Sequence, residues 1–404
     1  MVPWGVTMRL ETMSIAPEHF ESLVEELRFR YHKWDAYVGG ILRVVPHALV
    51  IAQNEHEEAV QSCIRLQGAF ERAAARLFDE PAWMDRLGIP KVVQQIARAE
   101  SPHPYSVVRY DLIPTATGWM APEVNEDAPG GFNESIAGRP LFGGRLNGFA
   151  IPGDFAKSFQ DSMPPGKRAG LIYATGYAED LQHMLILADL LREKGVESVL
   201  ASPEHLTCRP YGRPRICGEP VDWIFRFFPG EWYAYLDNTR TWCRTVARIP
   251  VVNPLSRLLR QTKGLYALWR ETPLVDEDDT ALLNKFTPHT EFFQRDRVDF
   301  YLAHREEWAL KQLFGRMGDT VTLGRLCTQA VWEKAIEEAA KKPETWIAQH
   351  AFSPLPVSNG AHTLFPALGV YLINGAFAGY YSRADELGLT THEAHYVVTA
   401  VETA

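Results

Sequence analysis

One short charged pattern constrains the fold of this chain more than any other. Arg109-Tyr-Asp111 is followed, twelve residues past the aspartate, by Glu123-Val-Asn125. Strand-forming residues flank the turn segment 115–118, which ends in the glycine that a three-residue hairpin loop favours. We therefore predict a β-hairpin in which Asp111 lies opposite Glu123. The same register sets Arg109 opposite Asn125, and because residues two apart on a strand share a face, all four side chains point the same way.

The predicted face carries the ligands of a divalent cation. Two carboxylates and one amide oxygen are hard oxygen donors, and Mg²⁺ favours such donors while completing its shell with water and substrate phosphates. The sequence therefore predicts Asp111, Glu123 and Asn125 as metal ligands. A solvated hairpin with a charged outer face is the alternative that the same spacing allows.

Composition excludes several classes of function. A chain of 404 residues with 46% hydrophobic and 23% charged residues is typical of a globular protein with two or three subdomains. A formal charge of -9 argues against nucleic acid as the main partner. The first residues lack the layout of a signal peptide, and no apolar run is long enough to cross a membrane. We expect a cytoplasmic protein without a membrane partner, and its oligomeric state cannot be read from the sequence.

The organisation along the chain is expected to have four parts. They are a helical N-terminal region (1–104), the metal-ligand hairpin with a substrate loop (105–160), a βαβ subdomain (161–245) and a nucleotide-binding region (246–404). The long loop is predicted at 130–153 because this stretch is rich in glycine and proline. The βαβ unit has no GxGxxG fingerprint, so we do not expect a dinucleotide site there.

Two lysines in the last part have surroundings suited to phosphate. Lys263 lies near the start of a predicted helix. Lys311 lies on a predicted strand and is followed by Gly315-Arg316-Met317-Gly318. A lysine offers a point charge to phosphate oxygens, and a glycine-flanked turn offers backbone N–H groups that can close over them. A solvated surface residue is the alternative for each lysine.

Three later segments complete the pattern. Residues 345–352 form a buried-strand pattern that contains Gln349. Residues 369–383 form a predicted hairpin, with Asn374-Gly375 supplying a type I′ turn and Arg383 ending the second strand. His392 and His395 are three residues apart and do not match the spacing of a zinc-binding helix, so we expect no metal there.

Taken in order, these segments resemble the glutathionylspermidine synthase-like ligases, a circularly permuted branch of the ATP-grasp enzymes. The resemblance covers about residues 105–395. Its motifs are Arg109-x-Asp111, Glu123-x-Asn125-x-Asp127-x-Pro129 with Glu134, Asp222 with 225–232, Asn253-Pro to Lys263, Lys311 with Gly315-Arg-x-Gly318, Gln349, and 369–383. In most ATP-grasp enzymes the acidic ligands follow the lysines, whereas here they precede them. The implied fold is α+β, an ATP-grasp fold with a helical N-terminal region and a small βαβ (pre-ATP-grasp) subdomain.

The resemblance also implies an activity and a set of roles. The activity is that of an ATP-dependent carboxylate-amine ligase, which forms an amide bond through an acyl phosphate. ATP and Mg²⁺ would be the cofactors, with a small-molecule or peptide carboxylate and an amine as substrates. The implied roles are metal binding for Asp111, Glu123 and Asn125, ATP binding for Lys263, Lys311, Gly315, Arg316, Gly318 and Gln349, and a catalytic position beside the transferred phosphoryl group for Arg109 and Arg383.

This sequence departs from the family pattern on the substrate side. Met317 stands where the covering loop usually has glutamate, and Ala128 and Gly130 replace threonines of the acidic motif. No Cys-His module precedes the ligase motifs, so we expect synthesis without an amidase activity. The identities of the carboxylate and the amine stay open. A kinase of the same fold and a non-catalytic nucleotide-binding protein are the alternatives.

Overall fold

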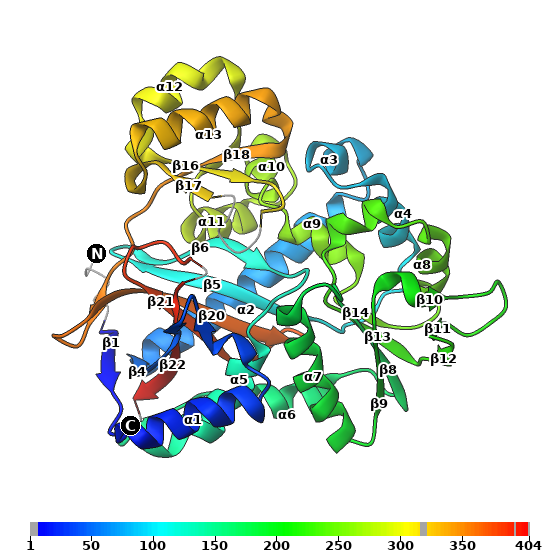
Figure 1. Ribbon diagram of the computed structural model, residues 1–404. Helices are drawn as coiled ribbons and strands as arrows, with labels where there is room; N and C mark the ends of the chain where they lie inside the picture. Colours follow the sequence, from blue (N-terminus) through cyan, green and yellow to red (C-terminus); the bar gives the residue numbers. More distant parts are fainter. Residues whose placement is uncertain (1–6, 316–320, 392, 403–404) are drawn as a thin grey trace.

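The computed structural model describes residues 7–315, 321–391 and 393–402 (Figure 1). Its largest element is a sheet that has nine strands within these residues, seven of them in the order β1-β4-β22-β21-β20-β5-β6. Neighbouring strands are antiparallel except for β4 and β22, which are parallel. The strands are β1 (Arg9–Thr12), β4 (Val44–Ile51), β5 (Val107–Thr115), β6 (Gly118–Asn125), β20 (Thr363–Ile373), β21 (Ala376–Asp385) and β22 (His395–Glu402), with β7 (Phe149–Ala150) beside β22 and β19 (Val357–Ser358) beside β20.

The predicted hairpin is present with the predicted register. Strands β5 and β6 pair Asp111 with Glu123 and Arg109 with Asn125. The turn differs in one detail, because Thr115 pairs with Gly118 and the loop is therefore one residue shorter than predicted. A β-bulge after Asp111 absorbs the difference. The bulge leaves the charged half of the hairpin in the register that the sequence predicts.

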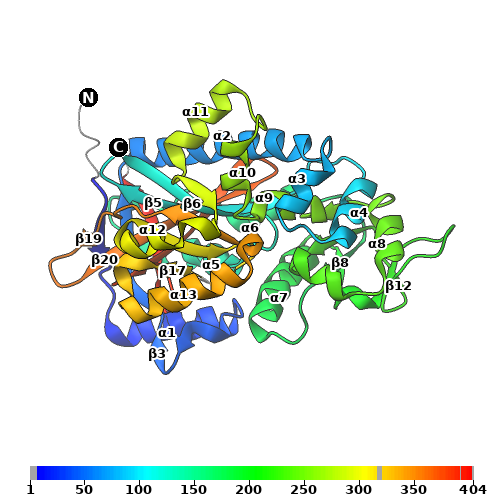
Figure 2. The same ribbon diagram turned by 90° about the horizontal axis from the view of Figure 1, so that it is seen from above.

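Helices cover both faces of the large sheet. On one face, α2 (Gln53–Arg76) packs against β20, β21 and β22, and it shares its core with the β5 side chains of Val108, Tyr110 and Leu112. On the other face, α5 (Phe132–Phe142) packs against β21 and β22, α6 (Phe155–Ser162) packs against β20 and β21, and α1 (Pro17–Phe29) lies next to α5. Figure 2 shows α2 on one side of the sheet and α1 and α5 on the other. Alternation along β5 therefore turns its charged residues away from α2.

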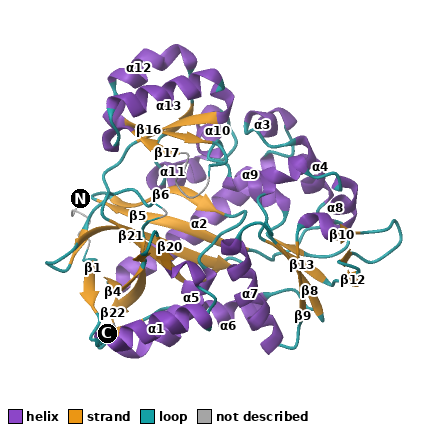
Figure 3. Ribbon diagram, in the orientation of Figure 1, coloured by secondary structure: helices purple, strands orange, loops and turns teal. Residues whose placement is uncertain are grey.

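A second, parallel sheet forms the βαβ unit that the sequence predicts. Its order is β14-β13-β8-β9, and all its neighbouring strands are parallel. The elements are β8 (Arg168–Ile172), α7 (Ala178–Glu193), β9 (Glu197–Ala201), β13 (Trp223–Arg226) and β14 (Val251–Val252). In Figure 3 its strands form a group apart from those of the large sheet.

A third, four-stranded sheet carries Lys311 and Gln349. Its order is β15-β18-β16-β17, and all three pairings are antiparallel. The elements are β15 (Thr290–Phe292), α12 (Val298–Ala303), β16 (Trp308–Gln312), β17 (Val321–Leu323), α13 (Gln329–Lys341) and β18 (Trp346–His350). The sheet has its own apolar core with α12 and α13 and lies above the β5–β6 hairpin in Figure 1.

The prediction that residues 1–104 are helical is only partly right. Helices α1, α2, α3 (Pro81–Arg86) and α4 (Lys91–Ala99) lie there, but β1 and β4 join the large sheet. Two further short strands, β2 (Tyr37–Val38) and β3 (Ile41–Leu42), pair with each other. The β4 segment VVPHALVI is rich in β-branched residues and is buried over its last four positions, which favours a strand.

The prediction of a loop over 130–153 is wrong in its central part, because helix α5 occupies Phe132–Phe142. The one glycine of this helix, Gly138, serves packing instead of a turn. A Cβ on Gly138 would lie 2.6 Å from the Tyr396 hydroxyl, so a larger residue there would push the Tyr396 side chain of β22 away.

The remaining elements connect these parts. They are α8 (Thr239–Val246), α9 (Leu258–Gln261), α10 (Leu265–Glu271), α11 (Glu277–Phe286) and a small sheet of β10 (Leu206–Thr207), β11 (Arg215–Ile216) and β12 (Glu219–Pro220). Of the helices in the described residues, none is both long and apolar enough to cross a membrane.

Candidate functional site

The site is built around Asp111, which is only 4% exposed. Arg109 donates to both of its oxygens, through Nε at 2.7 Å and Nη2 at 2.9 Å. Arg383, which reaches across from β21, donates to Oδ2 at 3.0 Å. Burial alone would raise the pKa of the Asp111 carboxyl, but the two arginines outweigh it and hold the pKa below its usual value. Asp111 is therefore ionised and fixed in position.

The other two predicted metal ligands lie beside it. Asn125 donates from its side-chain nitrogen to Asp111 Oδ2 at 3.2 Å. Glu123 is 34% exposed at its side chain, and one of its oxygens lies 3.4 Å from Lys263 Nζ. Burial would raise the pKa of Glu123, but the charges of Lys263 and Lys311 lower it below its usual value. Both carboxylates are thus in the charged form that binds cations.

This donor set fits Mg²⁺ better than a metal that needs a closed cage of protein ligands. It offers two carboxylates and an amide, and each carboxylate oxygen has more than one acceptor position. Among His, Cys, Asp and Glu, no group of three side chains in the described residues is placed to hold a metal ion. A cation here would complete its shell with water and phosphate.

A glycine opens the space that the arginine and the aspartate fill. In the sheet register, Gly369 lies between Asp111 and Tyr381. A Cβ on Gly369 would lie 2.1 Å from the Tyr381 backbone oxygen, 3.0 Å from Arg109 Cδ and 3.2 Å from Asp111 Oδ1. Any side chain at this position would displace the site.

We therefore expect Gly369→Ala to lower the free energy of unfolding by about 1–3 kcal/mol, the usual cost of overpacking, and to weaken ATP binding. Urea denaturation and a fluorescence titration with ATP measure the two effects. Gly176→Ala is the matched control, because nothing lies within 4 Å of a Cβ on Gly176. Equal stability and equal ATP affinity for the two variants would contradict the expectation.

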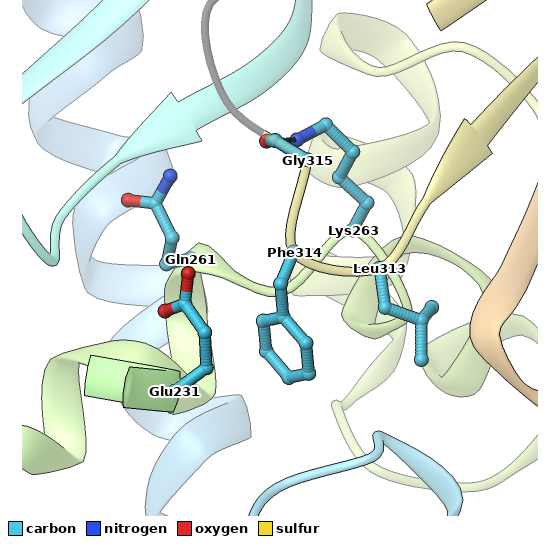
Figure 4. A pocket seen from close by; sticks show the side chains of 6 residues that line it. All are labelled: Glu231, Gln261, Lys263, Leu313, Phe314 and Gly315. Atoms are coloured by element: carbon cyan, nitrogen blue, oxygen red, sulfur yellow. Dashed lines mark hydrogen bonds between the residues drawn. The ribbon is translucent and has the colours of Figure 1, made fainter. Parts of the chain in front are cut away.

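Both predicted phosphate-binding lysines point toward the same place. The Lys263 ammonium donates to the Gly315 carbonyl at 2.7 Å, and its backbone N–H donates to the Leu313 carbonyl at 3.1 Å. Figure 4 shows the Lys263 side chain reaching to Gly315, with Phe314 between it and Glu231. The six residues drawn there line a small hollow.

Lys311 lies on β16 and is 7% exposed. Burial, and then the nearby charge of Lys263, lower its pKa to about 8, although Glu123 acts in the opposite direction. Lys263 and Lys311 therefore lie within electrostatic reach of Glu123 from two different elements.

A second hollow of about 380 Å³, open to solvent, joins the hairpin to the four-stranded sheet. Gln349 lines it but is not free, because its amide nitrogen donates to Thr290 Oγ1 at 3.0 Å and to the Pro122 carbonyl at 3.5 Å. The lining residues are Pro122, Ala309, Lys311, Val321, Leu323, Arg325, Gln349, His350, Ala351, Phe352 and Gly388.

The structure thus brings most of the predicted site residues together. Hydrogen bonds, ion pairs, electrostatic effects or a shared hollow connect the following residues: Arg109, Asp111, Glu123, Asn125, Lys263, Lys311, Gly315, Gln349 and Arg383. Arg316, Met317 and Gly318, the rest of the predicted covering loop, lie outside the described residues. Four side-chain cations face two carboxylates, so the site has a surplus of two positive charges and suits a polyanion.

Glu126 and Asp127, which follow the predicted metal ligands in the sequence, are buried in ion pairs outside the site. Asp127 and Arg226 are both fully buried and joined by a 2.6 Å ion pair, and the Gly230 N–H donates to the second Asp127 oxygen at 2.9 Å. Glu126 is likewise buried and pairs with Arg257 at 2.8 Å. These carboxylates hold the segment after β6 to the parallel sheet and to the residues before α9, which the sequence did not predict.

Sequence reasoning also missed two neighbours of the site. Tyr381 lies with its ring 5.1 Å from the Arg109 guanidinium carbon and 5.5 Å from that of Arg383. Gln261 accepts hydrogen bonds from the backbone N–H groups of residues 126 and 127 at 2.7 and 3.0 Å. Tyr381 lies two residues before Arg383 on the same strand, so strand alternation could have predicted that both face the site. The sequence around Gln261 contains no such pattern.

Comparison with known proteins gives one decisive match. The family model described as "Glutathionylspermidine synthase preATP-grasp" matches residues 12–402. No curated protein sequence gave a match.

Among solved structures, the chain is similar to a candidate gamma-glutamylcysteine synthetase from Methylobacillus flagellatus KT, with 14% identity, a TM-score of 0.46, and coverage of 82% of this chain and 88% of that one. It is also similar to D-alanyl-alanine synthetase A from Vibrio cholerae, with 13% identity, a TM-score of 0.33, and coverage of 55% and 67%. Because both identities and both TM-scores are low, only the family match assigns the chain to a family.

Proposed function

The chain belongs to the glutathionylspermidine synthase preATP-grasp family and is an ATP-dependent ligase of the ATP-grasp type; we propose that it joins a carboxylate to an amine through an acyl phosphate. One observation carries the proposal. The β5–β6 hairpin presents two ionised carboxylates and Arg109 to a place where three further cations gather from three other positions in the fold. Such a constellation suits a nucleotide triphosphate with its metal.

Each proposed role follows from the chemistry of the side chain. Lys263 and Lys311 bind the phosphates of ATP, and the hollow beside Gln349 takes the base and sugar. Asp111, Glu123 and Asn125 would hold Mg²⁺, which shields the phosphate charge and polarises the γ-phosphoryl group. Arg109 and Arg383 stabilise the negative charge that develops on the phosphoryl oxygens during transfer.

The reaction then has two steps. A carboxylate oxygen of the substrate attacks the γ-phosphorus, and ADP leaves. The amine nitrogen next attacks the carbonyl carbon of the acyl phosphate, the nitrogen loses a proton and inorganic phosphate leaves. The arginines remain beside the same phosphoryl group in both steps, so one constellation serves both.

We expect ATP affinity to fall as the pH rises above 8. Lys311 has a lowered pKa of about 8 in the ATP-free protein, so it is charged below that pH and neutral above it. Since only the charged form attracts phosphate, the dissociation constant for ATP should rise about tenfold per pH unit above 8. Lys311→Arg should remove this dependence, because arginine stays charged. ATP titrations from pH 7 to 9.5 measure it, and parallel curves for the two proteins would contradict it.

Release of ADP tests the proposed reaction. The protein is incubated with ATP, Mg²⁺ and pools of carboxylates, with and without pools of amines, and products are followed by mass spectrometry. We expect amine-dependent ADP release with a new amide mass. A phosphorylated product that forms equally without amine would show a kinase instead. Retained ATP binding without turnover in any pool would show a non-catalytic nucleotide-binding protein.

A further inference from the structure

A second buried charged cluster lies beside the site, and the roles above do not use it. It consists of Lys33, Asp35 and Glu134, which come from the segment after α1 and from the first turn of α5. Lys33 Nζ lies 2.7 Å from Glu134 Oε1 and 2.9 Å from Asp35 Oδ1. Although burial lowers the pKa of Lys33, the charges of Glu134 and Asp35 raise it above its usual value, so the lysine is charged. The cluster holds one cation and two carboxylates.

The negative surplus extends to the N-terminus of α7. Glu179 is exposed in the first turn of that helix, and desolvation, followed by the charge of Asp35, raises the pKa of its carboxyl. Gln182 anchors the segment, because its side-chain oxygen accepts from the Trp34 N–H at 2.9 Å. Asp35 and Glu134 therefore share a single lysine, and the exposed Glu179 acts on them only through its charge. An additional cation would relieve this repulsion.

One oxygen of the cluster has no partner. Glu134 is 1% exposed, and while Oε1 contacts Lys33, Oε2 is buried and accepts no hydrogen bond from any described residue. A buried carboxylate oxygen without a donor is costly. Asp35, in contrast, is 35% exposed at its side chain, so the cluster has an open end. A ligand with N–H donors and a positive charge satisfies both features.

The cluster is tied to the predicted reacting centre by a short backbone segment. The Gly130 carbonyl accepts from Arg109 Nη1 at 2.5 Å, and it also accepts from the Tyr371 hydroxyl. Gly131 lies against the Tyr381 ring, where a Cβ would approach within 2.5 Å. Three residues further on, Glu134 points into the cluster. The Tyr381 ring therefore lies beside Arg109 and Arg383 and also beside the backbone segment that leads to Glu134.

From these observations we propose that Lys33, Asp35 and Glu134 form the binding site for the ammonium group of the amine substrate, with Glu134 Oε2 as its buried acceptor. This inference rests on the proposed function for its biological meaning. The site holds the cationic end of a substrate, and the backbone segment 130–134 links it to the phosphoryl-transfer centre. Lys33 fixes the geometry of the two carboxylates without neutralising them.

Binding of a simple ammonium ion tests this site without requiring turnover. The probe is n-butylamine, which is protonated at pH 7.5, with 1-butanol as the neutral probe of equal shape, and binding is followed by saturation-transfer NMR. We expect the wild-type protein to bind n-butylammonium and not 1-butanol. Glu134→Gln and Asp35→Asn should each weaken binding at least fivefold and leave the ATP-induced rise in melting temperature unchanged.

Glu25→Gln is the matched control, since Glu25 is exposed on α1, and it should bind the probe as the wild type does. Unchanged binding in Glu134→Gln and Asp35→Asn would overturn the proposed site, as would equal binding of 1-butanol. If Glu134→Gln does not fold, Asp35→Asn decides alone, because its side chain is partly exposed. Failure of the proposed function shows up separately, as a lack of amide formation by the wild-type protein.

Discussion

Asp111→Asn is expected to reduce the rate of amide formation by about 10³-fold or more while changing ATP affinity by less than about tenfold. The substitution keeps the size of the side chain but removes the charge that holds two arginines and that the proposed metal ion would bind. Without that charge, the Arg109 and Arg383 side chains lose their common anchor. The lysines that we assign to the ATP phosphates are on other elements and keep their positions.

The rate of turnover and the affinity for ATP are measured separately. Turnover is followed as ADP release with saturating substrates, and ATP affinity is measured by titration in the absence of the other substrates. Asp161→Asn serves as control, because Asp161 is an exposed aspartate that pairs only with surface lysines. Turnover within tenfold of the wild type would remove Asp111 from the catalytic role, and a loss of ATP affinity as large as the loss of turnover would make it a binding residue.

The charged hairpin could be predicted because its evidence is local. Strand alternation and a glycine-ended turn predict which residues face each other, and the pairing of Asp111 with Glu123 is as predicted because the β-bulge offsets the shorter loop. The single β-bulge could not be predicted, because it depends on how the tight turn packs. Helix α5 was missed for the opposite reason, since its one glycine, Gly138, contacts Tyr396 of β22, far away in the sequence.

The Lys33 cluster also lies beyond prediction from the sequence. Lys33 and Glu134 are about a hundred residues apart, and they meet only because α1 packs on α5. Neither residue belongs to a periodic pattern that marks it. The sequence also does not reveal that Glu123 lies in the site whereas Asp127, four residues later, is buried. Asp127 is buried because it pairs with Arg226 of the parallel sheet.

The buried pair of Asp127 and Arg226 leads to a second prediction, which concerns the stability of the fold. Asp127→Asn is expected to lower the free energy of unfolding by about 3–5 kcal/mol, the usual cost of breaking a buried ion pair. Arg226 is fully buried and would keep its charge without the carboxylate that now compensates it at 2.6 Å. The Gly230 N–H would in addition face an amide group in place of a carboxylate oxygen. Urea denaturation measures the change.

Glu123→Gln is the control for Asp127→Asn, because Glu123 belongs to the same motif but is 34% exposed and paired only at 3.4 Å. We expect it to change the free energy of unfolding by less than about 1 kcal/mol and yet to lose most of its turnover. Asp127→Asn should show the reverse, with turnover per folded molecule near that of the wild type. If both variants lost activity without losing stability, the buried pair would belong to the site after all. The expected pattern, in which Glu123→Gln loses turnover and Asp127→Asn loses stability, would show that Glu123 serves the reaction and Asp127 serves the fold.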